Sequence, residues 1–180
     1  NVKNPSDGTV AKTNIESNPI FIDNKVISVS ADWRVIANNA ITGELIWDLQ
    51  SLTVPGRRGI VAYKDIISNK NYVFIPLGNK IYKINVKNGK IEKDFGSKGF
   101  VKSFTLVAPM IYEDRLIIVG TNSISTFNIK SGKKIKRYSL RNKKQNFVRG
   151  NIWGGVALDQ KKGIVFANTG NPQPGMYGTK

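Results

Sequence analysis

Apolar and polar residues alternate with a period of two along most of this chain, a pattern that predicts β-strands. Clear examples are the segments 34–37, 80–84 and 123–127. Each is followed within a few residues by a glycine in a polar turn, at Gly43, Gly89 or Gly132 in turn. Glycine readily adopts the positive φ that a tight hairpin requires. No segment has a convincing helical period, so we expect an all-β protein.

The turns belong to an internal repeat. Its copies are residues 39–47, 85–93 and 128–136, each interpreted as strand, turn and strand. The turn glycines are 46 and then 43 residues apart. This period is typical of one blade of a β-propeller, which spans roughly 40–50 residues.

A second hairpin precedes each copy, at 19–30, 59–76 and 109–120. Two hairpins per repeat predict a four-stranded antiparallel blade. A fourth unit begins at 153–159 and returns at 164–167. We therefore interpret residues 1–180 as a single partial β-propeller. The expected blades are approximately 16–50, 56–95, 105–140 and an incomplete 150–180.

Composition limits the chemistry that the chain can perform. It contains neither cysteine nor histidine, which excludes thiol catalysis, Ser-His-Asp triads and sites with Cys or His ligands. A bound metal must use oxygen ligands, which favours a hard cation such as calcium. No apolar run is long enough to span a membrane, and no signal peptide is visible. Because the chain does not begin with Met, we expect a processed or truncated product.

The chain is strongly basic, with a formal charge of +16 from 28 Lys and Arg against 12 Asp and Glu. The cations are mostly lysines spread over turns, so the charge does not favour a nucleic-acid partner. The exception is 130–144, where eight basic residues gather. This segment is either a solvated face or a contact for an acidic partner or an anionic surface.

The repeat is most complete in residues 37–47, which read Ala-Asn-Asn-Ala-Ile-Thr-Gly-Glu-Leu-Ile-Trp. This segment resembles the repeat of the pyrroloquinoline quinone (PQQ) propeller superfamily, Ala-x-Asp-x-x-Thr-Gly-x-x-x-Trp, with Asn39 in the Asp position. The later copies keep the glycine, and Lys93 and Lys136 stand in the Trp position. Four further segments resemble motifs of the PQQ-dependent quinoprotein dehydrogenases, in the same order. The first three are 16–20 (Glu-x-x-Pro), 57–63 (Arg-Gly with Tyr) and 95–99 (Phe-Gly-x-x-Gly). The fourth is the most specific and consists of 153–159 (Trp-Gly with Asp) followed by 169–174 (Thr-Gly-Asn-Pro-x-Pro).

The resemblance implies a site at the centre of a ring of about eight blades, of which this chain would supply about three and a half from the N-terminal part. Trp153 would be the aromatic floor under the quinone, and Asn171 would be a calcium ligand. Arg58, or Arg57 in the alternative alignment, would pair with a carboxylate of the cofactor. Glu16 would make a polar contact at its rim.

Each of these residues also has a structural interpretation. Trp153 could pack between blades, as we expect Trp47 to do, and Asn171 could shape the turn before a proline. Arg58 and Glu16 could be ordinary surface charges.

The resemblance implies a PQQ- and Ca²⁺-dependent dehydrogenase that oxidises a sugar or alcohol by hydride transfer to the quinone. A quinone or cytochrome would accept the electrons, and the location would be periplasmic, where missing parts could attach it to the membrane. The absent Cys pair favours the glucose or sorbosone type over the methanol type. The catalytic Asp is expected after residue 180, so the fragment alone should be inactive. The alternative is a non-catalytic PQQ-repeat propeller that serves as a protein-binding scaffold, as in outer-membrane assembly.

Overall fold

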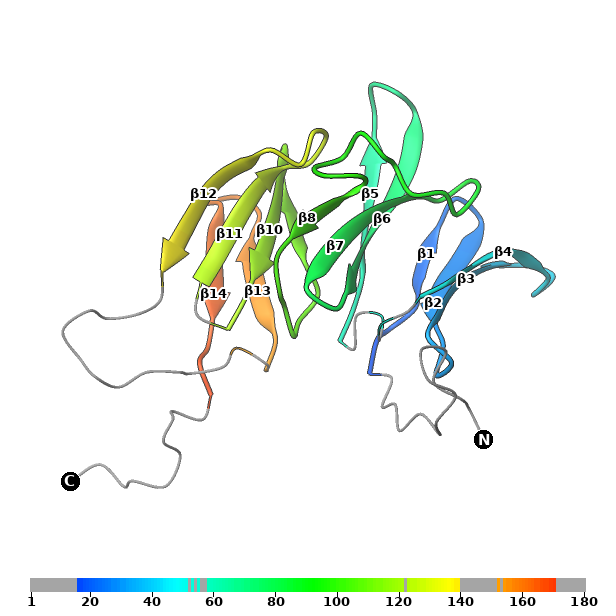
Figure 1. Ribbon diagram of the computed structural model, residues 1–180, viewed down its shortest axis with the longest axis horizontal. Coiled ribbons are helices and arrows are strands. Elements are labelled where there is room, and N and C mark those ends of the chain that lie inside the picture. Colours follow the sequence, from blue (N-terminus) through cyan, green and yellow to red (C-terminus); the bar gives the residue numbers. More distant parts are fainter. Residues whose placement is uncertain are drawn as a thin grey trace.

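The computed structural model describes residues 16–51, 53, 55, 58–121, 123–139, 152 and 154–170. Within these residues all regular structure is β-strand (Figure 1), and there is no helix that is long and apolar enough to cross a membrane. The strands form three four-stranded sheets and one two-stranded hairpin, and all strand pairs are antiparallel.

In every sheet each strand pairs with the strand that follows it in sequence. The first sheet contains β1 (Ile20–Ile22), β2 (Lys25–Val29), β3 (Arg34–Asn39) and β4 (Leu45–Gln50). The second contains β5 (Val61–Asp65), β6 (Lys70–Leu77), β7 (Lys80–Asn85) and β8 (Phe100–Lys102). The third contains β9 (Met110–Tyr112), β10 (Arg115–Val119), β11 (Ser123–Asn128) and β12 (Lys134–Ser139). The hairpin contains β13 (Val156–Asp159) and β14 (Ile164–Ala167).

The sheets follow one another side by side, so the hydrophobic cores lie between sheets (Figure 1). Ile27 and Val35 of the first sheet pack with Val73 and Ile75 of the second. Equivalent clusters join the second sheet to the third and the third sheet to the hairpin. Strands whose side chains alternate between two such interfaces form propeller blades. The predicted all-β propeller fragment is therefore confirmed.

The repeat produces the same turn in each four-stranded sheet, and an asparagine organises it. The Oδ1 atom of Asn39 accepts hydrogen bonds from the backbone N–H groups of Ile41 and Thr42, at 2.8 and 3.2 Å. Asn85 and Asn128 accept equivalent bonds in the later copies. Because the asparagine stabilises the turn internally, the repeat can tolerate varied residues between it and the glycine.

The second sheet departs from the repeat pattern after its turn. The pattern places a strand directly after Gly89, but only Ile91 forms an isolated bridge there, with Ile84. The chain then loops out, and the fourth strand, β8, begins at Phe100. The loop is held against the third sheet, since the N–H of Gly96 donates to the carbonyl of Ser131 at 2.8 Å. A contact with the next blade thus replaces local strand pairing.

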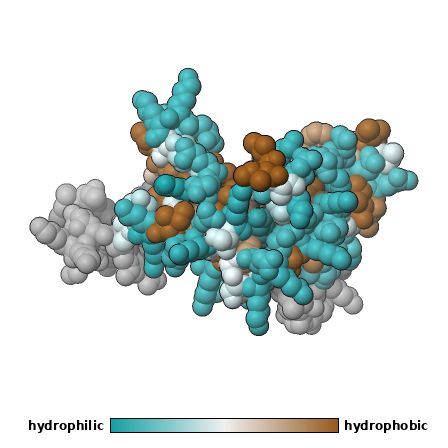
Figure 2. Space-filling view, turned by 90° about the horizontal axis from the view of Figure 1, so that it is seen from above, coloured by the Kyte–Doolittle hydropathy of each residue, from teal (hydrophilic) through white to brown (hydrophobic). Residues whose placement is uncertain are grey.

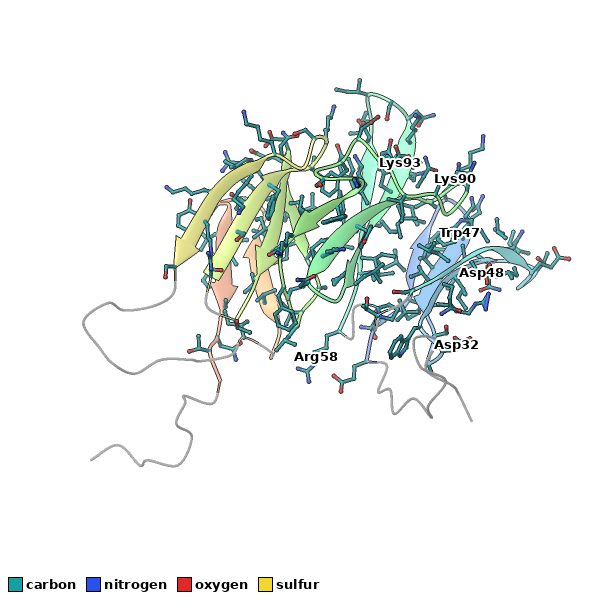
Figure 3. The ribbon with its side chains drawn as sticks, in the orientation of Figure 1. Asp32, Trp47, Asp48, Arg58, Lys90 and Lys93 are labelled. Carbon is teal, nitrogen blue, oxygen red and sulfur yellow. The ribbon has the colours of Figure 1, made fainter. Side chains whose placement is uncertain are left out.

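Trp47 packs between the first two sheets, as the sequence predicted. It is 9% exposed and belongs to the core shared by both sheets. Its indole Nε1–H donates to the carbonyl of Val86 at 2.8 Å. In Figure 3 its side chain lies on the side of the first sheet that faces the second.

Both ends of the described array leave hydrophobic residues exposed. Phe21, on the outer face of the first sheet, is 68% exposed, and Phe166 of β14 is 58% exposed. The edge of the array seen in Figure 2 is instead mostly hydrophilic, with separate hydrophobic patches. Such uncovered sheet faces are what a propeller fragment exposes where neighbouring blades would pack.

Candidate functional site

A cavity of about 500 Å³ lies where the chain enters the first strand of each blade. Glu16 precedes β1 and Arg58 precedes β5, while Pro109 stands directly before β9. Gly154 and Gly155 precede β13. Four segments far apart in sequence therefore converge on one cavity because each holds the same position in its blade.

Glu16 and Arg58 meet at this cavity. The Nε atom of Arg58 lies 2.8 Å from Oε2 of Glu16, and the two side chains are 34% and 49% exposed. Arg58 extends from the end of the sheets opposite to the β5–β6 turn (Figures 1 and 3). A half-exposed ion pair contributes little stability, about 0–1 kcal/mol. Its main effect is to hold a guanidinium at the cavity wall.

Gly59 explains how Arg58 reaches this position. Its φ of 134° lies in the region that favours glycine, and an added Cβ would come within 2.7 Å of the Cβ of Ala108. Ala108 and Pro109 lead directly into the first strand of the third sheet, and only glycine lets the two segments pass this closely. The close approach sets Arg58 beside the entry to that sheet.

Of the five site residues that the sequence predicted, the structure brings two together, Glu16 and Arg58. The other three, Arg57, Trp153 and Asn171, lie outside the described residues. Gly154 and Gly155, which directly follow Trp153, do line the cavity. The roles assigned to all five remain predictions.

Sequence reasoning missed the apolar part of the wall, formed by Val107, Pro109 and Met110. One signal was available for it. Pro109 precedes β9 just as Pro19 precedes β1, which marks 107–110 as the counterpart of 17–20, the segment directly after Glu16. The equivalence can be recognised only after the repeat has been aligned.

The cavity is suited to a small organic anion. Its volume falls in the usual range for ligand pockets, about 300–1,000 Å³, and apolar walls beside one cation are typical of such sites. A guanidinium is the side chain best matched to a carboxylate. The described lining contains one carboxylate, Glu16, and no group of three acidic side chains that could hold a metal occurs among the described residues. The described residues therefore fit a carboxylate of an organic ligand such as PQQ, and they offer a metal ion one carboxylate, that of Glu16.

The fold occurs in solved structures of related architecture. Quinohemoprotein alcohol dehydrogenase from Comamonas testosteroni matches 89% of this chain with 14% identity and a TM-score of 0.66, over 30% of its own length. A europium-containing methanol dehydrogenase matches 84% of this chain with 11% identity and a TM-score of 0.59, over 34% of its length. BamB from Moraxella catarrhalis matches 91% with 13% identity and a TM-score of 0.54, over 47% of its length.

These likenesses establish the fold, and the chain spans about a third of the length of the two dehydrogenases. No curated protein matches the chain in sequence. The sequence profile described as PQQ: glucose/ethanol/alcohol dehydrogenase, beta-propeller domain, matches residues 1–123, which is more than half of the chain. The chain therefore belongs to the family of PQQ glucose/ethanol/alcohol dehydrogenase β-propeller domains.

Proposed function

We propose that this chain is part of the propeller of a PQQ- and Ca²⁺-dependent dehydrogenase that oxidises a sugar or an alcohol. The observation that carries the proposal is the cavity where four blades converge, with Arg58 in its wall. The family match and the likeness to quinohemoprotein alcohol dehydrogenase support it.

Arg58 would bind a carboxylate of the cofactor. Glu16 now engages its Nε atom at 2.8 Å, which orients the planar group at the cavity. A charge-assisted bond to an arginine is stronger than one between neutral groups, so Arg58 would supply much of the affinity. Arg57 is the alternative partner, because the two arginines are adjacent in sequence.

Two residues outside the described structure complete the proposed site. Trp153 adjoins the lining glycine Gly154, and its indole would stack on the flat quinone. Asn171 would supply an amide oxygen to calcium, a ligand type that this ion accepts readily. The apolar wall at Val107 and Met110 would exclude water from the edge of the bound ring.

When bound, PQQ would supply a hydride acceptor for the carbon that bears the substrate hydroxyl, and calcium would supply Lewis acidity. These 180 residues would bind and orient the cofactor, and we assign no proton-abstracting carboxylate to them. The substrate preference we propose is of the glucose or sorbosone type. A quinone or cytochrome would serve as electron acceptor in the periplasm.

Cofactor binding can be tested by equilibrium dialysis of the chain against PQQ and Ca²⁺. Replacing Arg58 with Gln should weaken binding by about tenfold or more, as expected for the loss of a hydrogen bond to a charged group. The matched control is Arg34→Gln, because Arg34 also pairs with a carboxylate, that of Asp48, and is 39% exposed. Equal affinities in the wild type and both variants, or no retained PQQ, would contradict the proposal.

A scaffold propeller that binds other proteins is the second candidate. It is favoured by the mutual neutralisation of Glu16 and Arg58 and by the likeness to BamB. For this candidate the cavity needs no cofactor, and the rim loops would carry the function. It predicts that PQQ is not retained and that a chain assembled with further blades, PQQ and Ca²⁺ reduces no dye with sugars or alcohols.

A further inference from the structure

A second cavity, of about 260 Å³, lies at the outer part of the junction between the second and third sheets. It shares no lining residue with the central cavity. Three cationic side chains and three serines are part of its lining: Lys102, Lys134, Arg137, Ser103, Ser123 and Ser125.

The strand register explains why these residues converge. Arg137 stands opposite Ser125, and Lys134 opposite Phe127, in the ladder between β11 and β12. Residues that face each other across a ladder share one side of a sheet. Phe127 belongs to the core between the second and third sheets, so Arg137 and Lys134 lie on the side that faces the second sheet. Lys102 reaches the same space from the end of β8 in that sheet.

The cavity is electropositive and rich in hydrogen-bond donors. Its described lining contains no Asp or Glu, and none of its three cations makes an ion pair with a described residue. Ser125 is 6% exposed and forms part of the cavity wall. Three cations that have no counterion among the described residues, beside a buried serine, form an environment that favours an anion.

The backbone around this cavity is held firmly. The Oγ1 atom of Thr105 accepts a hydrogen bond from the N–H of Val107 at 3.1 Å and lies 2.8 Å from the carbonyl oxygen of Val119. An added Cβ on Gly120 would come within 2.9 Å of the carbonyl oxygen of Phe104. The 103–105 loop and the β10–β11 turn are therefore packed together, and the serines keep their positions.

We propose that this cavity binds a phosphate group, as the free ion or as a monoester. A carboxylate has one charge and two oxygens, which cannot occupy three cations and the serine hydroxyls at once. A phosphate monoester carries up to two charges and three strong acceptor oxygens, and arginine binds it in a bidentate manner. The site uses Lys134 and Arg137, two members of the basic segment 130–144 that the sequence singled out.

The direct test is calorimetric titration with inorganic phosphate and with glycerol phosphate, in buffers of matched ionic strength. Arg137→Gln should weaken phosphate binding about tenfold or more, and Lys102→Met, on the opposite wall, should weaken it as well. Arg115→Gln is the matched control, since Arg115 lies in the same sheet but pairs with Asp114 at 3.7 Å. Circular dichroism identifies any variant that fails to fold, in which case the other cavity variant decides.

Three results would overturn the proposal. One is unchanged phosphate affinity in the folded cavity variants. Another is a response to chloride equal to that to phosphate, which would indicate unspecific screening. The third is binding of an acidic peptide or of anionic vesicles that phosphate does not displace, which would assign the cations to a macromolecular surface.

Discussion

Neighbouring sheets dock on each other at two equivalent junctions, but different residues make the contact at each. At the junction between the first and second sheets, Trp47 both packs against the turn of the second sheet and donates a hydrogen bond to it. An added Cβ on Gly89 would lie 2.7 Å from the indole ring, and the Nε1–H donates to the carbonyl of Val86. One side chain performs both tasks.

At the second junction the two tasks are divided. Phe95 packs on the equivalent turn, where an added Cβ on Gly132 would lie 3.1 Å from its ring. The Nζ atom of Lys83 donates to the carbonyl of Ile129 at 3.3 Å. Ile129 follows Asn128 as Val86 follows Asn85, so the accepting carbonyl is the same position of the repeat.

The difference shows that the repeat preserves the receiving turn rather than the residue that docks on it. Lys83 is 5% exposed, and its Nζ lies 4.1 Å from the centre of the Tyr72 ring. An indole N–H is neutral, whereas an ammonium group must give up its hydration. Burial accordingly lowers the pKa of Lys83 below its usual value, while the negative charge of Glu92 acts in the opposite direction.

The largest effect is expected from Trp47→Ala. Truncating a buried aromatic side chain costs about 3–5 kcal/mol, and here the carbonyl of Val86 also loses its donor. Urea unfolding measures the change in the free energy of unfolding. Ile41→Ala, at a residue that is 88% exposed, should change it by less than about 0.5 kcal/mol. Equal effects of the two substitutions would refute the docking role.

Phe95→Ala should come next, at about 3 kcal/mol, because a fully buried ring is removed while the hydrogen bond from Lys83 to Ile129 is retained. Lys93→Ala is the informative comparison, since Lys93 occupies the Trp position in the sequence repeat. If Lys93→Ala destabilised the protein more than Phe95→Ala, the assignment of Phe95 to the docking role would be wrong.

A comparison of Gly89→Ala with Gly43→Ala distinguishes the cost of a steric clash from the cost of backbone strain. Both glycines have a positive φ, 69° and 76°, so both substitutions carry a conformational cost of about 1–2 kcal/mol. Nothing lies within 4 Å of an added Cβ at Gly43, whereas at Gly89 the Trp47 ring is in the way. Gly89→Ala should therefore cost about 1–3 kcal/mol more in denaturant unfolding. Similar values for both would mean that the indole does not rest on this turn.

The smallest effect is a pH dependence introduced by Lys83. Its folded-state pKa is lowered, so between that value and the ordinary 10.5 the unfolded chain binds more protons. Over this window the wild type should gain stability relative to Lys83→Met as the pH rises. Unfolding curves collected from neutral pH to about pH 10 measure the difference. A pH dependence no larger than that measured for Lys90→Met, at an exposed lysine, would show that Lys83 is not desolvated.

The sequence predicted the turns well because the asparagine and the glycine act locally. It did not predict the backbone where contacts between blades determine its course. Lys93 has the same position in the repeat as Trp47, but the hydrogen bond from the N–H of Gly96 to the carbonyl of Ser131 holds the loop against the third sheet. Phe95 therefore packs on the next turn in place of Lys93. The ion pair of Glu16 and Arg58 was foreseen as two separate contacts with a cofactor. Their mutual contact, and the apolar wall at Val107, depend on how the blades assemble.

The central claim is that the cavity beside Arg58 holds PQQ, and a crystal structure of the chain grown with PQQ and Ca²⁺ tests it most directly. We expect planar density between Arg58, Pro109 and Gly154, with a cofactor carboxylate at hydrogen-bonding distance from the guanidinium. A cavity that contains only solvent at saturating PQQ, with the pair of Glu16 and Arg58 intact, would contradict the claim.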